Sequence, residues 1–200
     1  MHTLLTKYIP EASIPAVVHL LESFRVKLKI VNVRVTRHGD YRLLPSGQHQ
    51  ITINFTQNKY RFFVTLIHEI AHLVAFEKYG RKILPHGSEW KKTFQQLMLP
   101  FLNPQVFPNE LLPVLAQHFK NPKASSDTDI KLALALKQYD IPNGKSLIFE
   151  LQEGDLFQIH NGRVFQKGPK RIKRFECIEI STGKRYLFNH NAEVDPLKNQ

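Results

Sequence analysis

Two histidines and a glutamate stand close together in TLIHEIAHLVAFEKYG, Thr65 to Gly80, a segment with the composition of an apolar helix. Each helical residue advances by about 100°, so His68, Glu69 and His72 would share one side of the helix. Two imidazoles at this spacing hold Zn²⁺, and the glutamate between them can take a proton from water at the metal. Burying these polar side chains without a partner would cost several kcal/mol. We therefore predict a zinc site with His68 and His72 as ligands and Glu69 as general base.

A hydrolytic zinc site needs a third protein ligand and an open position for water. A third ligand on the same helix is excluded, because Ala75 and Lys78 occupy the glycine and histidine positions of HExxHxxGxxH. The helix must end by Gly80, and the six residues after it are enough to bring His86 of HGSEW back to the site. We choose His86 as third ligand and expect one zinc ion per chain. The other candidates are His38, His49 and Glu89.

Periodicity and turn signals predict the elements that position these residues. Helices are expected over 13–24, 58–80, 88–98, 110–119 and 126–140, the last with Ser126 and Asp129 at capping-box spacing. Strands are expected over 26–37 and 50–55, with turns at Gly39-Asp40 and Pro45-Ser46-Gly47. This is an α+β fold in which a small antiparallel sheet precedes the metal-binding helix.

The chain changes character after IPNGKS, 141–146, which we interpret as a hinge between a domain at 1–140 and a small β module at 147–195. Turns are predicted at Asn161-Gly162 and at Ser181-Thr182-Gly183. We expect six apolar side chains to form the core of the module: Phe157, Ile159, Phe165, Ile178, Leu187 and Phe188.

The net charge of +11 is concentrated in two regions. Residues 1–100 hold 14 Lys and Arg against 6 Asp and Glu, a net charge of +8, and residues 160–190 hold 8 against 2, a net charge of +6. Such surfaces suit a polyanion. In KGPKRIKRF, between Phe165 and Phe175, the basic residues suit a DNA backbone, including a single strand. They are Lys167, Lys170, Arg171, Lys173 and Arg174. The alternative is a solvated hairpin whose rings face its core.

HEIAH followed by HGSEWK, with GDYR and HQITIN upstream, resembles the SprT-like family of zinc metalloproteases, relatives of the Spartan proteases that degrade proteins crosslinked to DNA. The similarity covers roughly residues 10 to 100. It implies a zincin-like core in which His68, His72 and His86 are ligands, Glu69 is the general base, and Trp90 packs against the loop that holds His86. Many members carry a four-cysteine zinc ribbon at the C-terminus. This chain has only Cys177, so we expect a metal-free β module.

These observations predict a zinc-dependent endopeptidase that acts on DNA-associated or DNA-crosslinked proteins. As in zincins, an extended substrate would pair with the strand Ile51 to Phe55. Two alternatives remain: a nucleic-acid-binding factor whose structural zinc has a fourth protein ligand, or a zinc hydrolase acting on another bond. With one cysteine, no apolar run of about 18 residues and no signal-peptide pattern, we expect a cytoplasmic protein without membrane contact.

Overall fold

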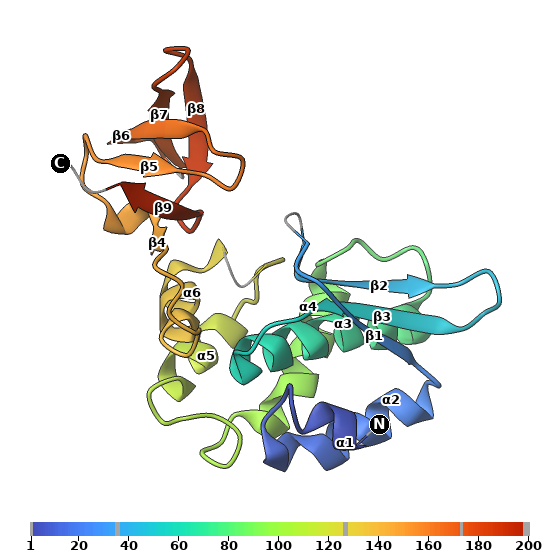
Figure 1. Ribbon diagram of the computed structural model, residues 1–200. Helices are drawn as coiled ribbons and strands as arrows, with labels where there is room; N and C mark the ends of the chain where they lie inside the picture. Colours follow the sequence, from blue (N-terminus) through green and yellow to red (C-terminus); the bar gives the residue numbers. More distant parts are fainter. Residues whose placement is uncertain (1, 35–36, 126–127, 173, 198–200) are drawn as a thin grey trace. The chain divides into compact units, whose positions relative to one another are not determined.

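The computed structural model describes residues 2–34, 37–125, 128–172 and 174–197 (Figure 1). The chain forms two compact units, residues 1–141 and 142–200, each with its own core. Its helices and mixed or antiparallel strands make it an α+β protein, as the sequence predicts. None of the helices in the described ranges combines the length and the apolar character needed to cross a membrane.

The first unit combines helices with a three-stranded sheet. Its strands are β1 (Lys27–Val31), β2 (Gly39–Leu43) and β3 (His49–Asn54). Its α-helices are α1 (His2–Leu5), α2 (Ile14–Ser23), α3 (Lys59–Tyr79), α4 (Ser88–Met98), α5 (Leu112–Phe119) and α6 (Ile130–Lys137). Single 3₁₀ turns precede α2, at Glu11–Ser13, and follow α4, at Leu99–Phe101.

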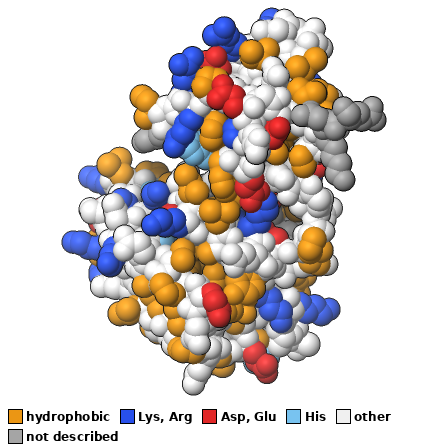
Figure 2. Space-filling view, turned by 90° about the vertical axis from the view of Figure 1, so that its left-hand side faces the viewer, with side chains coloured by type: hydrophobic (Ala, Val, Ile, Leu, Met, Phe, Trp, Pro, Cys, Tyr) orange, Lys and Arg blue, Asp and Glu red, His pale blue; other side chains and the backbone are white. Residues whose placement is uncertain are grey.

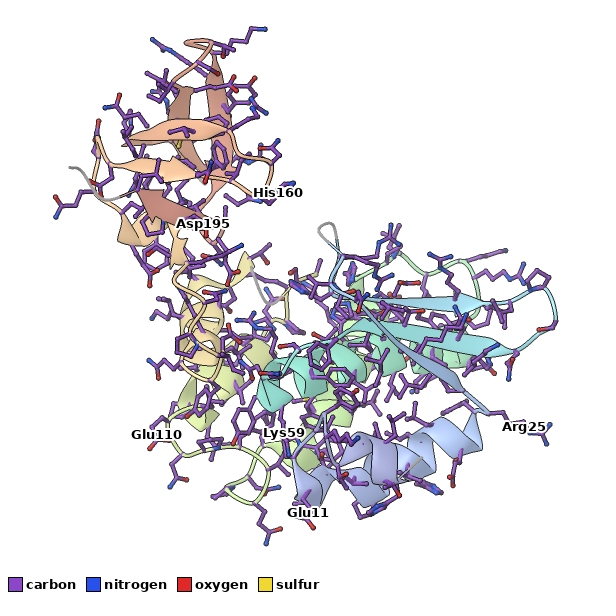
Figure 3. The ribbon with its side chains drawn as sticks, in the orientation of Figure 1. Glu11, Arg25, Lys59, Glu110, His160 and Asp195 are labelled. Atoms are coloured by element: carbon purple, nitrogen blue, oxygen red, sulfur yellow. The ribbon has the colours of Figure 1, made fainter. Side chains whose placement is uncertain are left out.

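The long helix α3 is the element on which the rest of the first unit is built. The side chain of Asn58 caps its start by accepting hydrogen bonds from the N–H groups of Tyr60 and Arg61, at 3.1 and 3.0 Å. Gly80 ends it with a φ of 76°, a conformation that glycine adopts without strain. The helix packs against β2, β3 and α4, and Lys59 marks its first turn in Figure 3. The helix predicted over 58–80 is confirmed.

The sheet has the order β1-β3-β2, with β3 in the centre. β2 and β3 form the expected antiparallel hairpin, but β1 runs parallel to β3, so the prediction of a purely antiparallel sheet was wrong. The connection from β1 to β2 crosses the end of β3, where the amide of Asn54 donates to the carbonyl oxygens of Arg34 (3.1 Å) and Arg37 (2.7 Å). Local alternation does not reveal such a crossing.

Two boundaries differ from the sequence prediction for the same reason. The strand expected over 26–37 ends at Val31, where the chain leaves the sheet, and Val33 is therefore 72% exposed. Val35 and Thr36 lie outside the described residues. Gly39 and Asp40, expected to form a turn, instead begin β2.

Helix α6 is attached to the start of α3 by polar contacts. Asn58 donates to the carbonyl oxygen of Leu136 (2.7 Å) and to the Asp140 carboxylate (2.6 Å), which also pairs with Arg61 at 3.0 Å. Asp129 caps the N-terminus of α6, whereas Ser126, its expected capping-box partner, lies outside the described residues.

The second unit is an antiparallel sheet in the order β4-β9-β5-β6-β7-β8. A 3₁₀ turn at Ile148–Glu150 follows β4. The tight turns at Gly162, beside the labelled His160 in Figure 3, and at Gly183 have positive φ, as predicted for these hairpins. The strands are β4 (Ser146–Leu147), β5 (Leu156–Gln158), β6 (Val164–Lys170), β7 (Arg174–Glu179), β8 (Arg185–Asn189) and β9 (Glu193–Leu197).

The core of the second unit corrects the predicted set at two positions. Ile178 and Leu187 are 37% and 55% exposed, because β7 and β8 turn the opposite set of side chains inward. The inward pairs across the two strands are Phe175 with Phe188 and Cys177 with Tyr186. The buried core comprises Ile148, Phe157, Phe165, Phe175, Cys177 and Val194.

Candidate metal centre

His68 and His72 lie one turn apart on α3, and their rings converge. Their Nε2 atoms are 3.1 Å apart and their ring centroids 4.9 Å apart. Both side chains are half-buried between α3 and its neighbours. The four-residue spacing thus places the two imidazoles side by side, as the helical geometry requires.

His86 reaches the same point from the loop between α3 and α4. Its Nε2 lies 3.0 Å from that of His72 and 3.2 Å from that of His68. The backbone of His86 has a φ of 60°, a left-handed conformation that is uncommon for a residue with a side chain. This strain, held in place by the Gly87 N–H donating to the carbonyl oxygen of Leu84 (2.9 Å), occurs where the ring is aimed at the other two.

The three nitrogens fit a metal better than they fit one another. Ligand nitrogens in a tetrahedral zinc site lie about 2.0 to 2.1 Å from the metal, and hence about 3.3 Å from each other. The observed separations of 3.0 to 3.2 Å are close to this. Each nitrogen of a neutral imidazole either donates or accepts, so a triangle of three cannot satisfy all its contacts with hydrogen bonds. His68, His72 and His86 are therefore a group that could hold a metal ion.

Burial keeps these imidazoles in the neutral form that binds metals. It lowers the pKa of His68 to about 2, with further contributions from the charges of His72, His86 and His118. Burial and then His86 lower the pKa of His72 to about 4, and burial lowers that of His86 as well. All three lone pairs are thus available at neutral pH.

Trp90, in the first turn of α4, forms the wall behind the histidines. It is fully buried, and its ring centroid lies 4.7 Å from those of His68 and His86 and 5.2 Å from that of His72. The Phe94 ring packs beside it, tilted by 40°, with centroids 4.9 Å apart. Contact with all three rings fixes the loop histidine relative to the helix histidines, which is the packing role expected of Trp90.

Glu69 lies beneath β2 and is only 6% exposed. Burial, and then the carboxylate of Asp40, raise its pKa to about 8, although the N–H of Tyr41 donates a hydrogen bond to it. A Cβ at Gly39 would come within 2.7 Å of Glu69 Oε1 and 2.9 Å of its Cγ. Gly39 therefore makes room for the carboxylate. Sequence reasoning assigned this glycine to a turn, and only the contact across the fold reveals its role.

The other candidate ligands do not join the cluster of described donors. His49 contacts the hydroxyl of Tyr41 (3.0 Å) and the carboxylate of Glu77 (3.5 Å), and Glu89 is bonded to Ser88. His38 lies in the connection before β2, where its carbonyl oxygen accepts from the N–H of Asn54.

The basic run of the second unit is not one uniform surface. Lys167 is only 6% exposed, donates to the carbonyl oxygen of Leu151 and lies 4.2 Å above the Phe175 ring. This burial does not support the prediction that Lys167 binds the DNA backbone. Lys170, Arg171 and Arg174 are exposed, and Arg171 pairs with Glu176 at 2.8 Å. Lys173 lies outside the described residues. Figure 2 shows basic side chains interspersed with apolar ones on the viewed face of this unit.

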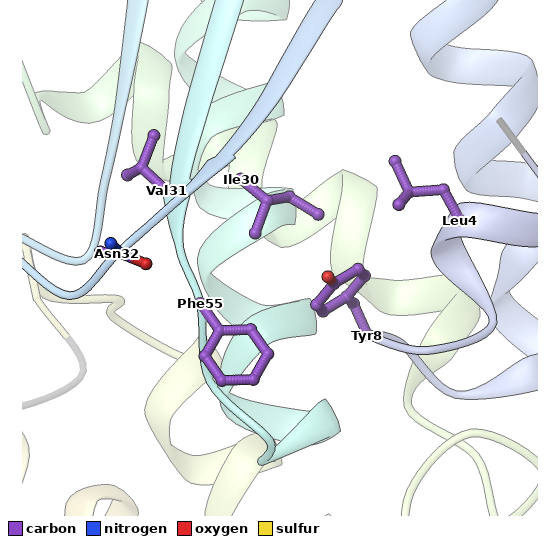
Figure 4. Close-up of a pocket in the computed structure, with 6 residues that line it drawn as sticks. All are labelled: Leu4, Tyr8, Ile30, Val31, Asn32 and Phe55. Carbon is purple, nitrogen blue, oxygen red and sulfur yellow. The ribbon is translucent and has the colours of Figure 1, made fainter.

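A shallow apolar hollow lies between α1 and the ends of β1 and β3 (Figure 4). Tyr8 and Phe55 meet edge to face in it, with centroids 6.1 Å apart, beside Leu4, Ile30, Val31 and Asn32. It contains none of the three clustered histidines and no carboxylate, so it offers no comparable chemistry.

Residues 16–108, which include the three histidines and Glu69, match the model of the SprT-like family. This segment is thus similar to the SprT-like family. The match confirms the resemblance seen in HEIAH and HGSEWK, and at the family level it indicates a function of the metalloprotease type. No solved structure matches the chain. The second unit begins well beyond the matched residues.

Proposed function

We propose that the first unit is a zinc-dependent endopeptidase. The observation that carries this proposal is the convergence of three Nε2 atoms within 3.0 to 3.2 Å of one another, with a buried glutamate next to one of them on the same helix. His68, His72 and His86 would hold the ion. When bound, zinc supplies a Lewis acid that polarises a substrate carbonyl and makes water a nucleophile near neutral pH.

The protein's own part in hydrolysis falls to Glu69. The raised pKa of Glu69 would fall beside a bound cation, so the carboxylate would stay ionised. The carboxylate would then accept a proton from the attacking water and deliver it to the leaving amine, so that water is divided between the two products. β2 covers this carboxylate and excludes solvent from it. Because Gly39 has no side chain, the carboxylate can lie close under the strand. Trp90 would hold the three ligands in register.

The position of β3 changes where a substrate would bind. Both edges of β3 are paired, to β1 and β2, so the strand Ile51 to Phe55 has no free backbone edge and cannot receive a substrate as expected. β2 is an outer strand of the described sheet, and its first residue lies over Glu69. We therefore assign the pairing of an extended substrate to β2.

The alternative of a structural zinc requires a fourth protein ligand. Within the described residues the donor group comprises three histidines, which supports an open position and hence an enzyme. Hydrolysis of another kind of bond is distinguished by the substrate assay below.

DNA-associated or DNA-crosslinked proteins are the substrate class that we propose. The support is the net charge of +8 over residues 1–100 and the exposed cations Lys170, Arg171 and Arg174 of the second unit. Phosphate contacts of this kind would concentrate the protease on DNA without selecting a sequence.

The test uses the full chain loaded with zinc. We expect cleavage of β-casein, an unstructured protein, and faster cleavage of a basic DNA-binding protein when DNA is present. Glu69→Gln removes the proton acceptor but no ligand, so zinc content and melting temperature should stay near wild type while kcat falls by about 10² to 10⁴. Equal cleavage by wild type and Glu69→Gln would refute the proposed function.

A further inference from the structure

Strand β8 is an outer strand of the described sheet of the second unit (Figure 1). The N–H of Glu179 donates to the carbonyl oxygen of Lys184 at 2.9 Å, and hydrogen-bonded pairs alternate with non-bonded pairs along an antiparallel ladder. Counted from this bond, the register with β7 aims the N–H and C=O groups of Arg185 and Leu187 away from β7. The other outer strand, β4, has only two residues. β8 therefore presents the longer backbone edge of this unit.

The outward side chains beside this edge are aliphatic. Leu187 of β8 and Ile178 of β7 are exposed, and so is Ile180, just after β7. Ile178 stands opposite Arg185, which places Leu187 on the diagonal from Ile178, within reach on the same face of the sheet. We call Ile178, Ile180 and Leu187 the aliphatic strip. It lies next to backbone groups that can still form a ladder.

Positive charge flanks the aliphatic strip. Lys184 and Arg185 are exposed at the start of β8. Glu176, the outward carboxylate of β7, stands opposite Leu187 and already pairs with Arg171 at 2.8 Å and with Arg185 at 3.3 Å. Residues 160–190 carry a net charge of +6. A partner of this edge is therefore expected to bring negative charge as well as apolar side chains.

Two other occupants fit this chemistry less well. A second copy would bring a β8 with the same cations, Lys184 and Arg185, to the edge, and repulsion between like charges opposes such pairing. A nucleic-acid backbone gains nothing from aliphatic side chains. The cations proposed above to meet phosphates, Lys170 and Arg174, also lie at the opposite end of β7 from the turn that carries Lys184.

We propose that β8 binds an extended acidic segment of a partner protein, which adds to the second unit as a further strand. Its main chain forms hydrogen bonds with Arg185 and Leu187. On the outer face, the partner residue opposite Leu187 is aliphatic and packs on the aliphatic strip, and the residue opposite Arg185 is Asp or Glu. This interaction does not depend on the proposed peptidase function.

The competing explanation is protective. Charged side chains on an outer strand keep it from pairing with other chains, and Lys184 and Arg185 would then have no further task. A protected edge binds no strand, whatever the charge of that strand. A recognition edge distinguishes an acidic strand from a basic strand of the same aliphatic content.

The probe is a fluorescein-labelled peptide that repeats Val-Thr-Glu-Thr, which in extended form alternates Val and Glu on one face. The comparison peptide has Lys in place of every Glu. Binding is measured by fluorescence anisotropy with the full chain carrying Glu69→Gln, so that the peptides are not cleaved. Amide chemical-shift changes in NMR spectra locate the bound peptide.

Three variants are compared on this background. Leu187→Pro removes an outward N–H and spares the ladder with β7, because that N–H faces away from β7. Arg185→Glu reverses the charge opposite the acidic partner residue, while Arg171 keeps its pair with Glu176. Ile172→Thr is the control, because it removes an aliphatic side chain that is 94% exposed but lies between β6 and β7.

We expect the unsubstituted edge to bind the Glu peptide about 10-fold more tightly than the Lys peptide, with shift changes centred on β8. Leu187→Pro should weaken the Glu peptide by about 10-fold, and Ile172→Thr by less than about 2-fold. Arg185→Glu should reverse the preference between the peptides. A loss of stability cannot produce this reversal, so the test stays decisive if Leu187→Pro does not fold.

Three results would overturn the proposal. The first is equal or undetectable binding of the two peptides, or shift changes remote from β8. The second is binding of single-stranded oligo(dT) that Leu187→Pro weakens as much as it weakens the Glu peptide, which would assign the edge to nucleic acid. The third is a dimer in sedimentation experiments that Leu187→Pro dissociates, which would assign the edge to a second copy of this chain.

Discussion

The buried charges of the second unit and the histidine cluster of the first unit differ in whether the fold supplies their partners. In the second unit, buried Lys167 donates to the carbonyl oxygen of Leu151, and buried Glu179 accepts from Arg163 and Thr182, both at 2.5 Å. In the first unit, three imidazoles meet at one point and have only each other as partners there.

The difference separates structural from functional polar groups. A buried polar atom that has its partner stabilises one arrangement of the fold, whereas converging atoms that cannot satisfy one another require something from outside. By this criterion the buried charges of the second unit serve to stabilise the fold of that unit. The histidines of the first unit call for a cation, and the predictions below test that contrast.

The largest effect is expected when one of the three converging imidazoles is removed. His72→Ala leaves two ligands, so zinc occupancy measured by elemental analysis should fall sharply and peptidase activity should be lost. Chelation should lower the melting temperature of wild type and hardly change that of the variant. One zinc per chain in purified His72→Ala would show that the metal is held elsewhere.

Gly39→Ala tests the cover over Glu69. The added Cβ would lie 2.7 Å from Glu69 Oε1 and 3.0 Å from Ile53 Cδ1, so the carboxylate must move. A displacement of about 1 Å in an active site costs about 10² in rate, and we expect kcat to fall by that order while zinc content is kept. Gly47→Ala, at an open turn with positive φ, is the control for strain without a contact. Unchanged kcat in Gly39→Ala would mean that the position of Glu69 tolerates this shift.

The elements that carry the site were predictable because their signals are local. Asn58 and Gly80 mark the ends of α3, and the HExxH spacing fixes two rings on one face of it. The third histidine was identified by elimination and loop length, and the family match extends through it.

What the sequence did not reveal depends on contacts between distant segments. The parallel pairing of β1 with β3 and the need for glycine at position 39 each join residues that no periodicity connects. The sequence did not show that Phe175 and Cys177 of β7 face inward, because apolar residues also occupy the alternate positions: Ile178 in the strand and Ile180 just after it are exposed. Alternation cannot choose between two apolar faces.

The acid stability of the second unit tests the other side of the comparison. Hydrogen bonds from Arg163 and Thr182 lower the pKa of Glu179 to about 2 from its usual 4.5. Because this pKa is lower in the folded than in the unfolded chain, the ionised carboxylate stabilises the fold at pH values above about 4.5. That stabilisation is lost as the pH falls from about 4.5 towards 2. The hydrogen-exchange protection factors over residues 142–200 should therefore fall in that window. In Glu179→Gln, protection should be lower at neutral pH and less dependent on pH; a variant with the wild-type profile would assign the acid sensitivity to another group.

The smallest effect concerns DNA, where the contrast between buried and exposed cations gives a matched pair of variants. Lys170 and Arg174 are exposed, so their joint replacement by Gln should weaken binding to every DNA sequence. The slope of log affinity against log salt should flatten by about 0.7 per lost contact for single strands and about 0.9 for duplex DNA. Lys167→Met removes a cation already bonded inside the unit, so the salt slope should stay that of wild type. The melting temperature should fall, because the carbonyl oxygen of Leu151 loses its donor. Cleavage of a free fluorogenic peptide should be the same in all three proteins, because the histidines and Glu69 lie in the other unit. Should the double variant keep the wild-type salt slope, phosphate binding would have to be sought on the +8 surface of residues 1–100.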